Sequence, residues 1–324
     1  MPRAIRIHAF GDSSVMRYEE IPDPTPKPGE AVVTIEAVGV NFLDVYHRSG
    51  VYPIPLPITL GQEGAGVVRS VGEGVTSVKV GDCVAWTGVF GSYAEVNVIP
   101  ANRLVHVPVG LQTKQAAAIM LQGITAHYLA TSTYPLKSGD TALVHAGAGG
   151  VGLLLTQIAK MRGARVITTV STPEKAQLSR QAGAVEVLDY PDDAAAFGAR
   201  IKELTDGGVA AVYDGVGADT FDASLASLAV RGTLALFGAA SGPVPPFDPQ
   251  RLNAAGSLFL TRPTLVHYTR TPDEFAWRAG ELLDAIAIGT ITVTVSERYR
   301  LEDAEQAHRD LQGRKTMGSV VLVP

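Results

Sequence analysis

The sequence has a single cysteine, no long apolar run and no surplus of basic charge. Because Cys83 stands alone, an intramolecular disulfide and any metal site built from several cysteines are excluded. Although 46% of the 324 residues are hydrophobic, no apolar stretch reaches the roughly 20 residues of a membrane-spanning helix. Since the first residues run directly into strand-like sequence without a signal peptide, we expect a soluble, cytoplasmic protein.

The net charge of −5 and the 6% share of aromatic residues bear on possible partners. Surfaces that bind nucleic acids or anionic membranes carry clustered basic residues, which nucleic-acid-binding proteins interleave with aromatic rings. No such cluster is present, so nucleic acid is not an expected partner. The seven histidines, at positions 8, 47, 106, 127, 145, 267 and 308, lack the paired spacing of metal ligands. We therefore expect no metal.

The most informative stretch is glycine-rich and runs from Val144 to Gly152. Gly147, Gly149 and Gly152 fit the pattern G-x-G-x-x-G, between a strand-like run and a segment with helical periodicity. In such a turn the glycines permit a tight bend, a close approach to a pyrophosphate and close packing of helix on strand. Backbone N–H groups at the start of the helix then face the phosphates. The stretch predicts a dinucleotide site.

The end of the next strand, Arg165–Val170, indicates which dinucleotide binds. An NAD enzyme places Asp or Glu there, where it accepts hydrogen bonds from the ribose 2′-hydroxyl. This chain has Ser171, Thr172 and Lys175 instead, and these groups suit a 2′-phosphate. A lysine solvated at the start of a helix is the alternative interpretation. We favour NADPH as the cofactor.

The first 110 residues or so read as a small β-barrel, because short β-type runs alternate with Gly and Pro turn signals. The clearest strands are Ala31–Val38, Gly64–Val71 and Val80–Trp86. A short helix is expected over Asn41–Ser49, and a longer helical stretch over Thr113–Thr131.

From about Ser138 the sequence alternates strand and helix, which predicts a doubly wound parallel sheet. The expected strands are Thr141–His145, Arg165–Val170, Glu186–Leu188, Ala210–Tyr213, Gly232–Phe237 and Ser257–Thr261. The expected helices are Val151–Arg162, Pro173–Ala182, Asp193–Leu204 and Thr220–Ala229. Beyond this sheet we expect helix Pro272–Ile288, strand Thr290–Val295, helix Leu301–Leu311 and strand Gly318–Val323. This tail should return to the N-terminal domain.

Several motifs outside the glycine turn carry a family resemblance. They are Gly39–Tyr46, Arg48–Pro53, Gly61–Gly66, Tyr213–Gly217 and Thr261–Leu265. With them the chain resembles, over essentially its whole length, the medium-chain dehydrogenase/reductase superfamily. Within it, the chain is similar to the zinc-free quinone oxidoreductase branch that includes ζ-crystallin.

The resemblance implies an α/β protein with a GroES-like β-barrel domain and a Rossmann domain with a six-stranded parallel sheet. It places the GroES-like catalytic domain at residues 1–122, the NADPH-binding domain at 123–263 and a segment completing the catalytic domain at 264–324. Similar enzymes bind NADPH in the cleft between the domains. They are commonly homodimers joined through the edge of the Rossmann sheet, here the Ser257–Thr261 run.

The resemblance also implies cofactor contacts. The 2′-phosphate would meet Ser171, Thr172, Lys175, Tyr190 and Arg314, and the other phosphates the backbone of Gly149, Gly150 and Val151. Asn41, Phe42, Tyr46, Thr125 and Tyr128 would lie towards the nicotinamide. Backbone around Gly215, Phe237, Gly238, Ala239, Pro263, Thr264 and Leu265 would complete the cofactor cleft.

The chain departs from the family pattern at a few positions. Zinc-dependent members carry Cys and a His-Glu pair where this chain has Asn41 and Gln62-Glu63, so zinc is not expected. Gln62 stands at a variable position and could alter substrate choice. Gln122 replaces a lysine of close relatives and could alter the charge of the cleft. Cys83, where arginine is usual, is interpreted as a core thiol.

Without a metal to lower the pKa of an alcohol, an electrophilic acceptor becomes the expected substrate. A quinone or an enone suits hydride transfer, since the incoming charge delocalises onto a distant oxygen. Asn41 and Tyr46 are our candidates to orient the acceptor and stabilise charge; Tyr52 and Gln62 are further candidates. The alternatives are packing for Tyr46 and helix capping for Asn41. His145 is interpreted as a buried, hydrogen-bonded residue rather than a catalytic one.

These inferences favour an oxidoreductase, an NADPH-dependent quinone reductase that takes a small-molecule quinone. An NADPH-dependent reductase of the C=C bond of alkenals or enones is the alternative on the same fold. An NADPH-binding, crystallin-like or RNA-contacting protein is the alternative of another class, and the acidic charge balance argues against it.

Overall fold

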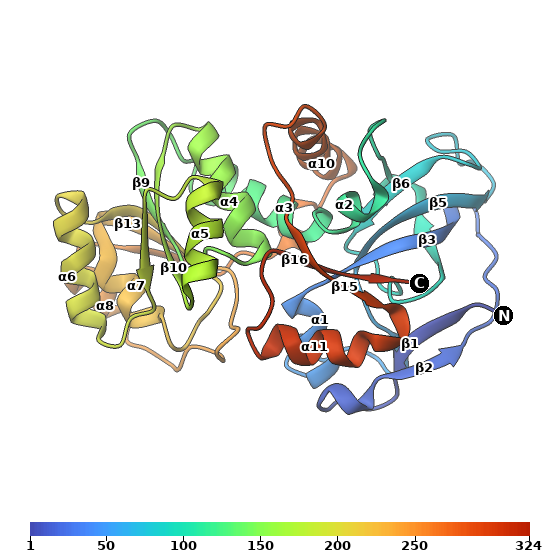
Figure 1. Cartoon of the computed structure of the whole chain (residues 1–324), viewed down its shortest axis with the longest axis horizontal. Helices are drawn as coiled ribbons and strands as arrows, with labels where there is room; N and C mark the ends of the chain where they lie inside the picture. Colours follow the sequence, from blue (N-terminus) through green and yellow to red (C-terminus); the bar gives the residue numbers. More distant parts are fainter. The chain divides into compact units, whose positions relative to one another are not determined.

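A computed structural model describes the backbone of residues 1–324 and the side chains of all of them except residues 296 and 297. The chain forms two compact units: residues 1–124 together with 268–324, and residues 125–267. Figure 1 shows both units with the chain coloured along the sequence. Among the described residues no helix combines the length and the apolar character needed to cross a membrane.

The unit of residues 125–267 is built on a six-stranded sheet in which every neighbouring pair is parallel. Its strands, in spatial order, are β11 (Glu186–Asp189), β10 (Arg165–Val170), β9 (Thr141–Val144), β12 (Val209–Asp214), β13 (Leu228–Leu236) and β14 (Phe259–Thr261). The connections carry the helices α4 (Gly150–Met161), α5 (Pro173–Ala182), α6 (Ala194–Thr205), α7 (Phe221–Ser227) and α8 (Gln250–Ala254). This order is the doubly wound Rossmann arrangement that the alternating pattern predicts.

Apolar side chains on one face of this sheet form a buried core that stabilises it. Leu143, Val212 and Leu234 come from neighbouring strands and are inaccessible to solvent, and they share a core with Ile201 of α6 and Phe221 of α7. Near-continuous apolar runs are expected where helices cover both faces of a parallel sheet. The same runs made these strands predictable.

The other unit is β-rich, as the N-terminal sequence predicts. Its larger sheet has seven strands: β15 (Val295–Arg300), β16 (Ser319–Val323), β3 (Glu30–Val40), β5 (Glu63–Val71), β6 (Cys83–Thr87) and β8 (Val105–His106) in that order, with β7 (Val96–Pro100) pairing with β3. A three-stranded sheet contains β2 (Arg17–Glu20), β1 (Arg3–Ile7) and β4 (Ile58–Thr59). The three helices of its N-terminal part are α1 (Phe42–Ser49), α2 (Thr113–Ala117) and α3 (Met120–Tyr128), the last of which ends within the Rossmann unit.

The C-terminal segment returns to this unit through strand pairing. β16, drawn in red in Figure 1, is antiparallel to β3, with Val321 opposite Gly39. The segment also contains α10 (Pro272–Ala287), the short turn η4 (Leu301–Asp303) and α11 (Ala304–Gln312). Chain ends far apart in sequence therefore build one sheet.

Some predicted boundaries were wrong. The strand expected at Thr290–Val295 begins only at Val295, because the N–H groups of Thr290 and Ile291 both donate to the Ala285 carbonyl and so form the end of α10. The helix expected over Thr113–Thr131 is interrupted at residues 118–119 and ends in a π-turn (Leu129–Thr133). The run Val80–Trp86 becomes a strand only at Cys83, since Gly81 (φ +92°) forms a turn. Cys83 is half-buried rather than in the core.

Candidate active site

The glycine-rich turn joins β9 to α4 with little room for side chains. A Cβ atom at Gly147 would lie 2.4 Å from Thr168 Cβ, and one at Gly152 would lie 2.3 Å from the Ala146 carbonyl oxygen. These two glycines are therefore required by the packing of α4 on the sheet. At Gly149, the N-cap of α4, a Cβ would meet only the Ala146 carbonyl oxygen, at 3.3 Å. The N–H groups of the first turn, at Gly150 and Val151, thus suit the phosphates of a dinucleotide.

The predicted 2′-phosphate residues gather at the end of β10. Thr172 caps α5 by accepting a hydrogen bond from the Lys175 N–H at 3.3 Å. The ammonium of Lys175 donates to the Ser171 hydroxyl, also at 3.3 Å. One cation and two hydroxyl groups therefore lie together where an acid would repel a phosphate. Ser171, Thr172 and Lys175 therefore fit the 2′-phosphate of NADPH.

Two further predicted contacts lie elsewhere. Tyr190 follows β11, which neighbours β10, and its ring is stacked on His145 with centroids 6.5 Å apart. Arg314 belongs to the other unit, in the turn after α11, where its φ is +56°.

A buried carboxylate fixes the turn after β12. Asp214 accepts hydrogen bonds from the N–H groups of Val216 and Gly217 at 2.8 and 3.0 Å. It also accepts from the hydroxyls of Thr220 and Ser224. The motif Tyr213–Gly217 carried the family resemblance but did not indicate this network.

The same network explains His145. Its Nε2 lies 3.1 Å from the Ser224 hydroxyl and its Nδ1 lies 2.8 Å from the Thr169 hydroxyl. Burial lowers the pKa of His145, so the ring is neutral. The prediction of a buried, hydrogen-bonded histidine is confirmed.

The remaining candidates of this unit follow neighbouring strands, whose carboxyl ends share one edge of the sheet. Gly215 packs on Phe237, since a Cβ at Gly215 would lie 2.8 Å from that ring, and Gly238 packs on the Gly215 backbone. Ala239 continues this loop, and Pro263, Thr264 and Leu265 follow β14. Thr125 and Tyr128 are buried on α3.

In the β-rich unit, α1 begins beside a buried glutamate. Glu63 is inaccessible to solvent; its Oε1 accepts a 2.6 Å hydrogen bond from Asn41 Nδ2, and its Oε2 accepts one of 2.5 Å from the Leu121 N–H. A Cβ at Gly39 would fall on this carboxyl group, 2.0 Å from Oε1. Burial raises the pKa of Glu63 to about 8, although the two N–H donors act in the opposite direction.

The Asn41 amide continues into a chain of hydrogen bonds. Its Oδ1 accepts from Gln122 Nε2 at 3.1 Å, and Gln122 Oε1 accepts from the Ser319 hydroxyl at 2.7 Å. The side chains of Asn41, Gln122 and Ser319 are buried, like that of Glu63. Gln122, which replaces a lysine of close relatives, therefore connects the Asn41 amide to β16 through neutral groups.

A second buried group of polar residues lies under α1, and sequence reasoning missed it. Asp44 Oδ2 accepts from the Asn41 N–H at 2.9 Å and from the Tyr93 hydroxyl at 3.0 Å. His308 Nε2 lies 3.0 Å from the same hydroxyl oxygen. Burial raises the pKa of Asp44 to about 7 and lowers that of His308 to about 3. Contacts among residues so far apart in sequence leave no local signal.

Aromatic rings lie along α1 and the loop that follows it. Phe42 and Tyr46 have ring centroids 6.1 Å apart, and Tyr46 and Tyr52 are 5.1 Å apart with an edge-on geometry. Gln62 lies near the same helix, with its Nε2 3.2 Å from His47 Nδ1. The candidate residues of the β-rich unit thus lie together around α1: Asn41, Phe42, Tyr46, Tyr52 and Gln62.

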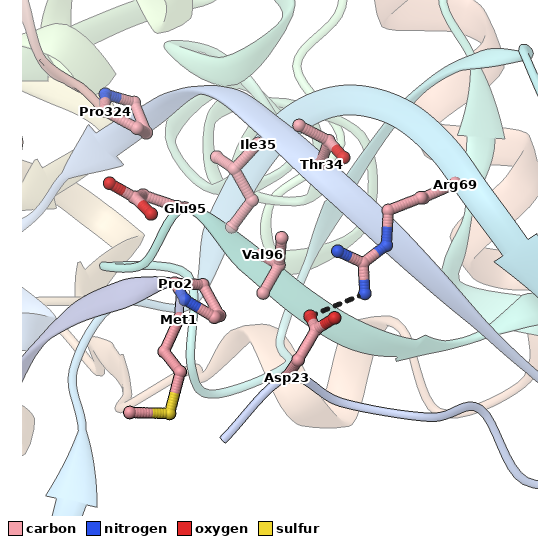
Figure 2. Close-up of a pocket in the computed structure, with 9 residues that line it drawn as sticks. All are labelled: Met1, Pro2, Asp23, Thr34, Ile35, Arg69, Glu95, Val96 and Pro324. Carbon is pink, nitrogen blue, oxygen red and sulfur yellow. Dashed lines mark hydrogen bonds and ion pairs between the residues drawn. The ribbon is translucent and has the colours of Figure 1, made fainter. Parts of the chain in front are cut away.

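A groove elsewhere in this unit contains none of the predicted residues. Figure 2 shows its lining, which includes Met1, Glu95 and the ion pair of Arg69 with Asp23 at 2.7 Å. Its volume is about 740 Å³. Among the residues whose side chains are described, no group of three or more His, Cys, Asp or Glu side chains could hold a metal ion.

Comparison with known proteins agrees with this architecture. Residues 27–109 match the alcohol dehydrogenase GroES-like domain, and residues 150–285 match the family described as zinc-binding dehydrogenase. These two domains in this order define a medium-chain dehydrogenase/reductase.

Similar full-length proteins narrow the assignment. A quinone oxidoreductase of Pseudomonas aeruginosa is 47% identical over 100% of both chains, and a 2-haloacrylate reductase of a Burkholderia species is 40% identical over 100% of this chain and 99% of its own. A mycobacterial protein solved in complex with NADPH is 59% identical, with a TM-score of 0.98 over 99% of this chain and 100% of its own. The chain belongs to the quinone oxidoreductase family.

Proposed function

We propose that this protein is an NADPH-dependent reductase of small quinones. The observation that carries the proposal is the pairing of the Lys175 ammonium with the Ser171 hydroxyl, 3.3 Å apart at the end of β10. This pair, beside the Thr172 hydroxyl that caps α5, offers a 2′-phosphate charge-assisted hydrogen bonds. The acceptor follows from the quinone oxidoreductase named above, which shares the whole length of the chain.

Most of the residues proposed to hold the cofactor belong to the Rossmann unit, and Phe42 and Arg314 belong to the β-rich unit. The N–H groups from Gly149 to Val151 bind the phosphates at the start of α4, and Tyr190 and Arg314 add contacts to the 2′-phosphate. Gly215, Phe237, Gly238, Ala239, Pro263, Thr264 and Leu265 supply backbone along the cofactor. Phe42, Thr125 and Tyr128 lie towards its nicotinamide end.

The residues around α1 hold the acceptor. When bound, NADPH supplies a hydride, and the quinone takes up this hydride and one proton from water to give the hydroquinone. Asn41 and Tyr46 orient the acceptor and donate hydrogen bonds to the oxygen that gains charge, with Tyr52 beside them. Because the Asn41 amide is held by Glu63 and Gln122, this donor is preorganised.

A cytoplasmic homodimer is part of the proposal. β14 forms one edge of the Rossmann sheet, and Phe259 at its start is 61% exposed. Pairing of this edge with a second copy would cover the ring and satisfy the unpaired backbone groups. Light scattering should give the mass of two chains, and Phe259→Arg should give that of one; a monomeric wild type contradicts this part.

Product analysis tests the reaction. With para-benzoquinone, one hydroquinone should form for each NADPH consumed. Conversion of cyclohexenone to cyclohexanone, with no quinone turnover, would favour the enone reductase, an alternative supported by the similarity to a 2-haloacrylate reductase. Tight NADPH binding without turnover of either acceptor would favour a binding protein.

A further inference from the structure

His47 presents a hydrogen-bond donor that the protein itself does not use. Gln62 Nε2 lies 3.2 Å from His47 Nδ1, and an amide nitrogen can only donate. Nδ1 is therefore the acceptor, and the ring proton is on Nε2. Burial lowers the pKa of His47 to about 4, so the ring remains neutral in this tautomer near pH 7.

The Nε2–H group has no hydrogen-bond partner among the residues whose side chains are described. His47 is only 7% exposed. Its Nε2 atom is nevertheless still accessible to solvent, since it is absent from the buried polar atoms that lack a partner. A donor on a buried residue costs free energy when it is left unsatisfied, so groups in this condition usually have a ligand or a water as partner.

The surroundings of this donor are aromatic. The ring of Phe90 lies 5.0 Å from that of His47 at an interplanar angle of 64°, and that of Tyr52 lies 6.2 Å away at 62°. Tyr52 in turn contacts Tyr46. Flat apolar walls with one N–H donor suit a flat ring that carries a carbonyl oxygen.

The chain also connects this donor to the acceptor residues. Gln62 precedes Glu63, the residue that binds the Asn41 amide, and His47 follows Tyr46 on α1. The same two segments, the beginning of β5 and α1, thus carry both Asn41 with its partner and His47 with its partner. Tyr52, whose ring lies against both Tyr46 and His47, places His47 beside the proposed acceptor site.

We propose that the Nε2–H of His47 donates a hydrogen bond to a carbonyl oxygen of the quinone, with Gln62 as the positioning residue that fixes the tautomer. Phe90 and Tyr52 form the walls against which the quinone ring lies. This inference rests on the proposed function and names the groups that recognise its acceptor.

Replacements of His47 that keep or remove the donor test the inference in the full-length protein. His47→Phe retains a ring without the N–H and should lower kcat/KM for para-benzoquinone about fivefold or more, the worth of one hydrogen bond. His47→Gln retains an N–H donor and should recover most of this loss. NADPH affinity, measured by fluorescence titration, should be unchanged in both variants. His106→Phe, at an exposed position on β8, is the matched control and should behave as wild type.

Gln62→Met is the second variant, because it leaves His47 in place and removes only the group that fixes its tautomer. It should lower kcat/KM for para-benzoquinone by a smaller factor. Unchanged kcat/KM in His47→Phe or in Gln62→Met overturns the inference, and so does an equal loss in His47→Phe and His47→Gln. A wild-type protein that does not reduce para-benzoquinone contradicts the proposed function instead, whatever the variants do.

Discussion

The side-chain amide of Asn41 donates a 2.6 Å hydrogen bond to the buried carboxyl group of Glu63. When Glu63 is ionised, both of its oxygens accept from N–H groups, so the amide of Asn41 points one way, with Nδ2 towards Glu63 and Oδ1 towards Gln122. The same order of donors and acceptors continues through the Gln122 amide, whose oxygen accepts from the Ser319 hydroxyl. Glu63 therefore determines which face of Asn41 carries a donor.

Glu63→Gln should change catalysis more than stability. The side chain of Gln has one oxygen where Glu has two, and this oxygen can still accept from the Leu121 N–H. The amides of Asn41 and Gln122 can both reverse, so that every hydrogen bond of the chain is formed again. At pH 9, above the pKa of about 8 of Glu63, we expect a melting temperature within a few degrees of wild type and turnover of para-benzoquinone reduced about fivefold or more. Equal turnover in the two proteins would show that the direction of the Asn41 amide has no role in the reaction.

Lys175→Ala should raise the KM for NADPH at least tenfold and barely change the KM for NADH. The lost charge-assisted hydrogen bond contributes about 1.5–3 kcal/mol, and only NADPH carries the 2′-phosphate that receives it. Steady-state kinetics with both cofactors measure the effect. Lys202→Ala, at an exposed position on α6, is the matched control. Equal increases for both cofactors would remove Lys175 from the phosphate site.

Tyr46→Phe separates chemistry from packing. The ring contacts to Phe42 and Tyr52 remain, so NADPH affinity and thermal stability should be unchanged. If the hydroxyl acts on the acceptor, kcat for quinone reduction falls. An unchanged kcat would reduce Tyr46 to an aromatic packing residue, the alternative that the sequence left open.

Asp44→Asn should change how stability depends on pH. The pKa of Asp44 rises from 3.8 to about 7 on folding, so the folded state holds its proton more tightly than the unfolded state. The stability that protonated Asp44 contributes to the folded state is fully present below about pH 4 and is lost as the pH rises through 7. Between pH 5 and 8, wild type should lose about 2–3 kcal/mol that the variant does not lose. Urea unfolding at both values measures the difference; parallel losses would place the pKa of Asp44 near its ordinary value.

Much of the fold was predictable because its signals are local. The glycine turn, the apolar runs of β9, β10 and β12, and the cap of α5 at Thr172 each lie within a few neighbouring residues. The cluster of Ser171, Thr172 and Lys175 was predictable for the same reason, since one strand end and one helix start hold it. A family resemblance supplied the remaining candidates.

The unpredicted parts depend on contacts between distant segments. Tyr93 and His308 are 215 positions apart, and neither has a neighbour that indicates the other. The role of Glu63 was hidden because its partners, Asn41 and the Leu121 N–H, come from two other segments. The prediction of a strand at Thr290–Val295 was wrong because a local signal misled. Alternating residues favour a β-strand, but the N–H groups of Thr290 and Ile291 donate to the end of α10.

Electron transfer from NADPH to a quinone is tested by one assay of the wild-type protein. Oxidation of NADPH and of NADH by wild-type protein should be followed in parallel, with para-benzoquinone as acceptor. Because two charge-assisted hydrogen bonds to the 2′-phosphate give about a hundredfold preference, kcat/KM should be higher for NADPH by about that factor. Equal or faster turnover with NADH would rule out a 2′-phosphate site at Lys175, and no turnover with either cofactor would rule out the quinone reductase.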